Sequence, residues 1–288
     1  MGGLKDMIAE WFKSILTEGI TANFTGMFDE LNNKVGEIAT QVGTTPQDWN
    51  SSVFGIIRTL SETVVIPVAG MILTFVLCYE LITMIIEKNN MADFDTWVIY
   101  KWILKTFVAV YILTHTFDIV MGVFSLAQHV VDGSAGVIGS SLDMSLALTE
   151  LQTQLAAMGI GELIGLYIES AILSLAMKAI SLCVFIIIYG RMIEIYLTCS
   201  IAPIPFSTMV NREWGHIGNS YLKSLFALAF QGFLILVCVA IYAILLQTIT
   251  ASANIHTAVW NTAAMSVLLI FTLFKTSSLA KGIFGAGH

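Results

Sequence analysis

The chain has 288 residues, of which 57% are hydrophobic and only 11% are charged. This composition, with a mean hydropathy of +0.83, excludes an ordinary soluble domain, in which about 25% of residues are charged. The formal net charge of −7 leaves no basic face that could hold a nucleic acid stably through the release of counterions.

Two stretches with a helical period come first in the chain. Their apolar positions form one stripe each, opposite Lys, Asp and Glu: Leu4, Met7, Ile8, Trp11, Phe12 and Ile15, then Phe24, Met27, Phe28, Leu31, Val35, Ile38 and Val42. We expect two amphipathic helices. They lie in the membrane interface or against neighbouring subunits, or they pack on the chain's own membrane domain, and the pattern does not choose between these placements. Thr45, Pro46 and Asp48 then predict a helix start with Thr45 as its cap.

Five apolar segments are predicted to cross the membrane. A hydrocarbon core of about 30 Å needs roughly 20 helical residues. The segments are residues 64–86, 105–126, 164–189, 221–246 and the shorter 260–274. Pro67 and Gly70 predict a kink or a local opening in the first of them. We therefore expect an all-α polytopic membrane protein, with an amphipathic region at residues 1–63 and a membrane domain at residues 64–288.

A further apolar run, residues 192–210, is interrupted by Pro203 and Pro205. Each proline removes a backbone donor and disfavours helix in the residue before it, so this run is not expected to be one unbroken helix. A broken helix at membrane depth must be shielded by protein or line a wet cavity. We predict a re-entrant or in-plane segment here, and with it five crossings and not six.

Basic residues predict the orientation of these crossings. If the segment at 192–210 returns to its own side, eight basic residues fall on one side: Lys88, Lys101, Lys105, Arg191, Arg212, Lys223, Lys275 and Lys281. By the positive-inside rule this side is the cytoplasm, which places the N-terminus outside and the C-terminus inside. The basic residues of the N-terminal region would then be exported, which counts against this orientation, although acidic neighbours balance them.

Motifs for catalysis are absent from the sequence. There is no GxxxxGK[ST] phosphate loop, no HExxH and no GxSxG, and the five histidines are scattered without the spacing of metal ligands. The four cysteines lie in apolar runs without paired spacing, which is typical of small core residues. They are Cys78, Cys183, Cys199 and Cys238. We expect no enzymatic activity, no cofactor and no metal.

Ionisable residues inside the apolar runs are the candidate functional groups, because such residues are unfavourable in a bilayer and tend to face a partner or a water-filled path. They are Glu80, Asp118, Glu169, Lys178, Arg191 and Glu194. Arg191 and Glu194 lie three apart and share a helix face, so they can pair, either for structure or for gating or partner contact. For Glu80 and Asp118, hydrogen bonding between helices is favoured over conduction.

Two of these residues lack a partner within their own helix. Glu169 and Lys178 lie nine positions apart, on opposite helix faces, so each needs a partner on another helix or another subunit. Gly161 and Gly165 nearby have the spacing of a close helix contact, although a polar residue between them weakens this signal.

Several features, taken in order along the chain, carry a family resemblance. They are the amphipathic N-terminal region, a Gly-rich linker at 127–163 without Lys or Arg, Arg191-Met-Ile-Glu194 running into Ala202-Pro-Ile-Pro-Phe206, and Phe230-Gln231-Gly232. In their order and spacing they resemble the TrbL-like polytopic subunits of type IV secretion systems. The stretches 1–8, 42–46 and 87–90 resemble more closely the versions carried by conjugative elements of Gram-positive gut bacteria and clostridia.

The resemblance implies a plasma-membrane subunit that helps to build the channel or platform through which a relaxase-bound single DNA strand leaves the donor. It implies as partners other secretion-system membrane subunits, separate ATPases and a cell-wall hydrolase, with transient contact to DNA at most. We also expect a homo-oligomeric ring, with a pentamer as one candidate. Two alternatives stay open. One is a small secondary transporter or ion channel that uses the embedded acids, and the other is a scaffold that conducts nothing.

Overall fold

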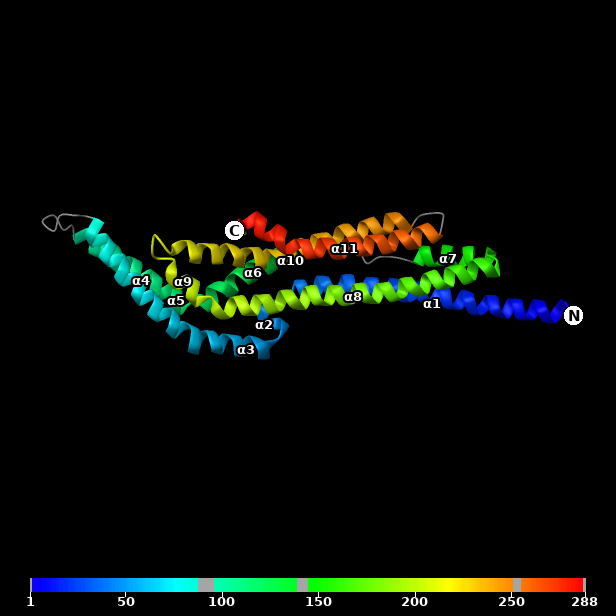
Figure 1. The fold of residues 1–288 in the computed structure, drawn as a ribbon, viewed down its shortest axis with the longest axis horizontal. Coiled ribbons are helices and arrows are strands. Elements are labelled where there is room, and N and C mark those ends of the chain that lie inside the picture. The colour runs from blue at the N-terminus through cyan, green and yellow to red at the C-terminus, as the bar shows by residue number, and fades with distance from the viewer. Residues whose placement is uncertain (1, 88–95, 139–144, 251–254, 287–288) are drawn as a thin grey trace. The chain divides into compact units, whose positions relative to one another are not determined.

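The computed structural model describes residues 2–87, 96–138, 145–250 and 255–286 (Figure 1). Lys88 and part of the Gly-rich linker lie outside these ranges. Within them the secondary structure is helical, with no strand. Five stretches are long and apolar enough to cross a membrane: Ser51–Ile86, Thr96–Thr114, Ile160–Ile201, Gly215–Leu245 and Trp260–Phe284. The predicted all-α fold with five candidate spans is confirmed.

The chain divides into two compact units, each assembled from segments that are distant in sequence. Unit 1 comprises Met1–Val42, Gly133–Ile188 and Leu234–Thr276. Unit 2 comprises Gly43–Asp132, Tyr189–Phe233 and Ser277–His288. Neither unit is one continuous piece of chain, so contacts between helices hold each of them together.

In unit 1, α1 (Gly2–Val42) pairs with the part of α8 (Ile160–Ile201) that ends at Ile188. Asn23 Nδ2 of α1 donates a hydrogen bond of 3.0 Å to Ser170 Oγ of α8. α1 is a single helix of 41 residues, where the sequence predicted two. No proline interrupts it, and burial of its apolar side chains from Leu16 onward favours one continuous helix.

α7 (Ser145–Ala157) and parts of α10 (Gly215–Thr250) and α11 (Ile255–Phe284) also belong to unit 1. Lys13 Nζ of α1 donates to the carbonyl of Ala156 at 2.8 Å, which ties α1 to α7. The hydroxyls of Tyr242 and Ser266, 2.7 Å apart and buried, join α10 to α11. Because these two hydroxyls bond to each other, neither is buried between apolar helices without a partner.

Unit 2 opens with the predicted helix start. The side chain of Thr45 accepts a hydrogen bond of 3.1 Å from the backbone N–H of Asp48, and α2 (Pro46–Trp49) and α3 (Ser51–Leu60) follow. A π-helical turn, η1 (Ser61–Val65), then leads into α4 (Ile66–Glu87). Pro67 lacks an N–H and crowds the carbonyl four residues before it, which accounts for the opening of the helix at this turn and confirms the predicted distortion.

The second candidate span lies earlier in the chain than predicted. It is α5 (Thr96–Thr114), and α6 (Thr116–Ile138) begins after a turn at His115, inside the predicted segment 105–126. The hydroxyls of Thr114 and Thr116 and His115 Nδ1 all bond to carbonyls of the preceding turn. Such bonds compete with the regular backbone ladder and bend helices.

The proline-broken run, residues 192–210, is interrupted as predicted, but the helix before it is longer than predicted. α8 does not end at Tyr189 but continues to Ile201, and a short helix, α9 (Pro203–Thr208), follows the break. The run at 192–210 is therefore not one helix, as expected. Protein shields the break, because most side chains of α9 are buried: Pro203, Pro205, Phe206, Ser207 and Thr208.

Gly218 allows α10 to pass close to the end of α9. A Cβ at this position would lie 2.1 Å from Met209 Cγ and 2.6 Å from the carbonyl oxygen of Pro205. The second atom belongs to the backbone and cannot turn away as a side chain can. Only glycine fits here without a shift of α9 against α10.

We expect Gly218→Ala to lower the free energy of unfolding by about 2 kcal/mol, the usual range for overpacking. Thermal unfolding of the detergent-purified chain measures this as a lower Tm. The matched control is Gly122→Ala in α6, where a Cβ would meet nothing within 4 Å and alanine favours helix. Equal Tm values for the two variants would contradict the close contact at Gly218.

Candidate functional site

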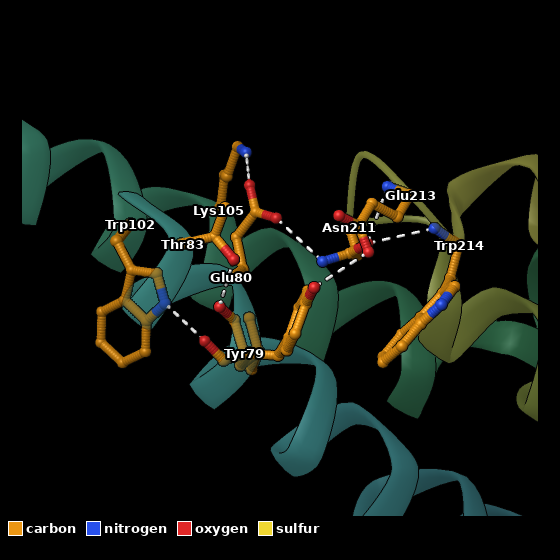
Figure 2. Close-up of polar contacts among 9 residues, drawn as sticks. Tyr79, Glu80, Thr83, Trp102, Lys105, Asn211, Glu213 and Trp214 are labelled. Carbon is orange, nitrogen blue, oxygen red and sulfur yellow. Dashed lines mark hydrogen bonds and ion pairs between the residues drawn. The ribbon is translucent and has the colours of Figure 1, made fainter. Parts of the chain in front are cut away.

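Glu80 of α4 is the one buried carboxylate in the described part of the chain, with 3% of its surface exposed. Lys105 Nζ of α5 donates to its Oε1 at 2.7 Å, and Asn211 Nδ2 donates to its Oε2 at 3.0 Å. Figure 2 shows the three side chains converging from three parts of unit 2. Both carboxylate oxygens are thus engaged, and the positive charge of Lys105 offsets the buried negative charge.

Asn211 connects this carboxylate to the loop between α9 and α10. Its Oδ1 accepts hydrogen bonds from the backbone N–H groups of Glu213 at 2.8 Å and Trp214 at 3.0 Å. This is the local turn that asparagine favours. Because these donors occupy the oxygen, the amide nitrogen is left to face Glu80.

Aromatic side chains hold the same loop against α4. The ring of Trp214 stacks on Tyr79 at a centroid distance of 5.1 Å and on Phe75 at 5.7 Å. The hydroxyl of Tyr79 donates to Glu213 Oε2 at 3.0 Å, and Trp102 Nε1 of α5 donates to the carbonyl of Leu77 at 3.1 Å (Figure 2). We call Glu80, Lys105, Asn211, Tyr79 and Trp214 the anchor cluster, because it fixes the loop that follows the proline break.

The geometry of the anchor cluster is that of a structural contact between helices and a loop. Each oxygen of Glu80 already has a donor, and the cluster joins α4, α5 and the α9–α10 loop. This arrangement matches the hydrogen bonding between helices that the sequence favoured for Glu80. It supplies rigidity to an irregular backbone segment.

Arg191 and Glu194 do not pair with each other in the structure, against expectation. Arg191 is buried, and its Nη2 donates to the carbonyl of Ala229 of α10 at 3.4 Å. Glu194 is exposed and lies 3.6 Å from Lys281 Nζ of α11. Although both residues lie on one face of α8, each is drawn to a different neighbouring helix, and this tertiary contact replaces the local pair.

The other candidate residues lie apart from the anchor cluster. Asp118 is exposed and 3.9 Å from Arg58 Nη2. Glu169 finds a partner on another helix, as expected, because its Oε2 lies 2.7 Å from Nδ1 of His256 in α11. Lys178 is exposed, with no ion pair to any residue that the structure describes.

Two smaller expectations are corrected. A Cβ on Gly161 or Gly165 would meet nothing within 4 Å, so these glycines make no close helix contact with the residues that the structure describes. All four cysteines are free, but Cys78 is exposed while Cys199 is buried, so not every cysteine is a core residue. Among the described residues no group of three His, Cys, Asp or Glu side chains is placed to hold a metal ion.

Sequence reasoning missed Asn211 and counted Lys105 only among the basic residues of the cytoplasmic side. The signal for Asn211 was present, since an asparagine soon after a proline break commonly forms a turn by bonding to the backbone that follows it. No periodicity links Glu80 to Lys105 or Asn211, because the three residues belong to different elements. Only the tertiary fold brings them together.

We expect Glu80→Ala to destabilise unit 2 by about 2 kcal/mol, because it leaves Asn211 and the charged Lys105 without their acceptor. Asn211→Ala should cost a similar amount, and the double variant should cost less than the sum of the two. Thermal unfolding in detergent tests this cycle, with Asp132→Ala, an exposed carboxylate elsewhere in unit 2, as a control of small effect. Simple additivity would show that Glu80 and Asn211 do not interact.

Comparison with known proteins places this architecture in a family. The family model described as TrbL/VirB6 plasmid conjugal transfer like protein matches residues 31–203, more than half of the chain. No curated protein and no solved structure matches. The chain therefore belongs to the TrbL/VirB6 conjugal transfer family and is a multi-pass membrane component of a conjugal transfer, or type IV secretion, system.

Proposed function

We propose that this chain is a non-enzymatic channel or platform subunit that helps relaxase-bound single-stranded DNA to cross the donor plasma membrane. It acts as a homo-oligomeric ring beside separate ATPases, a cell-wall hydrolase and other membrane subunits of the machine. The family and the five candidate spans support this role. The net charge of −7 favours transient contact with the DNA over stable binding.

The single observation that carries this proposal furthest is the way the anchor cluster holds the α9–α10 loop. The cluster buries Glu80 and Asn211 but leaves Arg212, Glu213 and His216 exposed. A loop that is rigid at its base and polar at its surface suits a docking point for another protein, because little conformational entropy is lost on binding. We assign this loop, with the proline break before it, to contact with the cytoplasmic ATPases.

The same contacts support the proposed orientation, with the N-terminus outside and the C-terminus in the cytoplasm. Lys105 and Asn211 meet at Glu80, so the two segments expected in the cytoplasm lie together. Lys281 near the C-terminus contacts Glu194 in the same unit. These segments carry most of the basic residues that the positive-inside rule assigns to the cytoplasm.

A donor from which the gene is deleted in frame should lose conjugal transfer, and the wild-type gene in trans should restore it. Arg212→Glu with His216→Glu should fail to restore transfer, since it makes the exposed loop surface acidic and changes none of the five residues of the anchor cluster. Transfer frequency is the readout, and an immunoblot of the membrane fraction shows that the variant is inserted.

Arg191→Ala and Pro203→Ala are also expected to abolish transfer while leaving insertion intact. Normal transfer in the deletion strain would overturn the conjugation role. Liposome flux that depends on Glu80 or Asp118 would favour the transporter alternative instead.

Labelling of single cysteines tests the orientation. In a background without the four native cysteines, Glu10→Cys, at an exposed position near the N-terminus, should react with a membrane-impermeant maleimide in intact cells. Arg212→Cys should react only after the membrane is opened. The reverse pattern would invert the proposed topology, and reaction of both in intact cells would place the two positions on the same outer side.

A further inference from the structure

Lys178 is an exposed cation in the middle of an apolar helix face. It lies near the centre of the predicted span 164–189, between Leu175 and Leu182, whose side chains are 71% and 59% exposed. None of the described residues forms a hydrogen bond or an ion pair with it. A lone lysine at membrane depth is unfavourable and requires a partner or water, so this face of α8 is incomplete in a single copy of the chain.

A second incomplete surface lies on α1 of the same unit. A hollow of about 820 Å³ there is lined by Gln152 of α7 and by small and polar side chains of α1, among them Thr21, Ala22, Thr25 and Gly26, with Asp29 at one end. Small residues let a second helix approach closely, and threonine hydroxyls are unfavourable against lipid. Asp29 is exposed and, like Lys178, has no partner among the residues that the structure describes.

Asp29 of α1 and Lys178 of α8 lie at nearly the same position along the axes of these two paired helices. Asn23 of α1 meets Ser170 of α8, 147 positions later in the chain. Further along, Lys34 and Ser181 line one cavity, and they are separated by the same number of positions. With this offset of 147 positions, Asp29 of α1 lies beside position 176 of α8. Position 176 is about 3 Å from Lys178 along the helix axis.

The matching axial positions of Asp29 and Lys178 are relevant because of the symmetry of a closed ring. Copies of a chain in a closed ring are related by rotation alone. Where the helices run along the ring axis, residues that touch across an interface therefore lie at one height. An unpaired cation and an unpaired anion at one height, on different helices, meet this condition.

We propose that the exposed face of α8 in one copy packs into the hollow on α1 of the next copy, where Lys178 pairs with the neighbour's Asp29. The leucines beside Lys178 then leave the lipid for a surface of small side chains, and both charges gain a partner. This inference rests on the homo-oligomer proposed above and not on what the assembly transports.

Cross-linking between two tagged chains tests the contact. Both full-length chains lack the native cysteines and carry different tags; one carries Lys178→Cys and the other Asp29→Cys. Co-expression in one membrane and mild oxidation should give a disulfide-linked product with both tags. An intrachain contact cannot give that product, because each chain has a single cysteine.

The control is Glu18→Cys in place of Asp29→Cys. Glu18 lines the same hollow but lies eleven positions, or about 16 Å, from Asp29 along α1. A cross-link to position 18 and not to position 29 would overturn the proposed register. Oligomers of full size without either cross-link would overturn the contact while leaving the ring intact, and a monomeric chain would overturn both.

Charge exchange gives a second readout. Lys178→Asp and Asp29→Lys should each lower the oligomeric fraction in detergent, and the two together should restore it. A defect in folding alone would not be rescued by the second change. Failure of the exchanged pair to recover, with each single variant impaired, would show that the two residues do not pair.

Discussion

Lipid cannot supply hydrogen bonds to a broken backbone, and this constraint governs the structure around Pro203 and Pro205. The prolines remove two donors from a helix that is otherwise apolar. The protein responds by burying α9 and by clasping the loop after it through Glu80, Lys105 and Asn211. The close approach of α10 at Gly218 has the same effect, because it packs α10 directly against Pro205 and Met209 beside the break.

Charged groups inside the apolar helices follow a common rule. Glu80, Glu169 and Glu194 each meet a basic partner on a different helix, and Arg191 reaches a backbone carbonyl of α10. Such contacts connect distant parts of the chain and specify which helices are neighbours, since apolar faces alone discriminate poorly between partners. In a bundle of similar apolar helices, charges therefore contribute to the choice of arrangement.

Sequence patterns predicted the features that depend on local chemistry. The cap at Thr45, the distortion before Pro67 and the break at Pro203 follow from side chains acting on their own backbone. Predictions failed where tertiary contacts decided the outcome. Arg191 and Glu194 share a face, but helix spacing cannot say which neighbours draw each side chain away. Asn211 joins the anchor cluster through residues more than a hundred positions distant, and α1 continues as one helix because α7 and α8 pack along it.

The π-turn η1 within the first candidate span has a mechanical consequence. A π-turn holds one residue more than a regular turn, and absorbing or moving that residue rotates the helix beyond it by about 100°. Ser61 within the turn is buried, and its hydroxyl has no hydrogen-bond partner in the described chain, so no polar contact of that side chain locks the turn. A shift of this extra residue along the chain would therefore change the twist between α3 and α4 without breaking the helix.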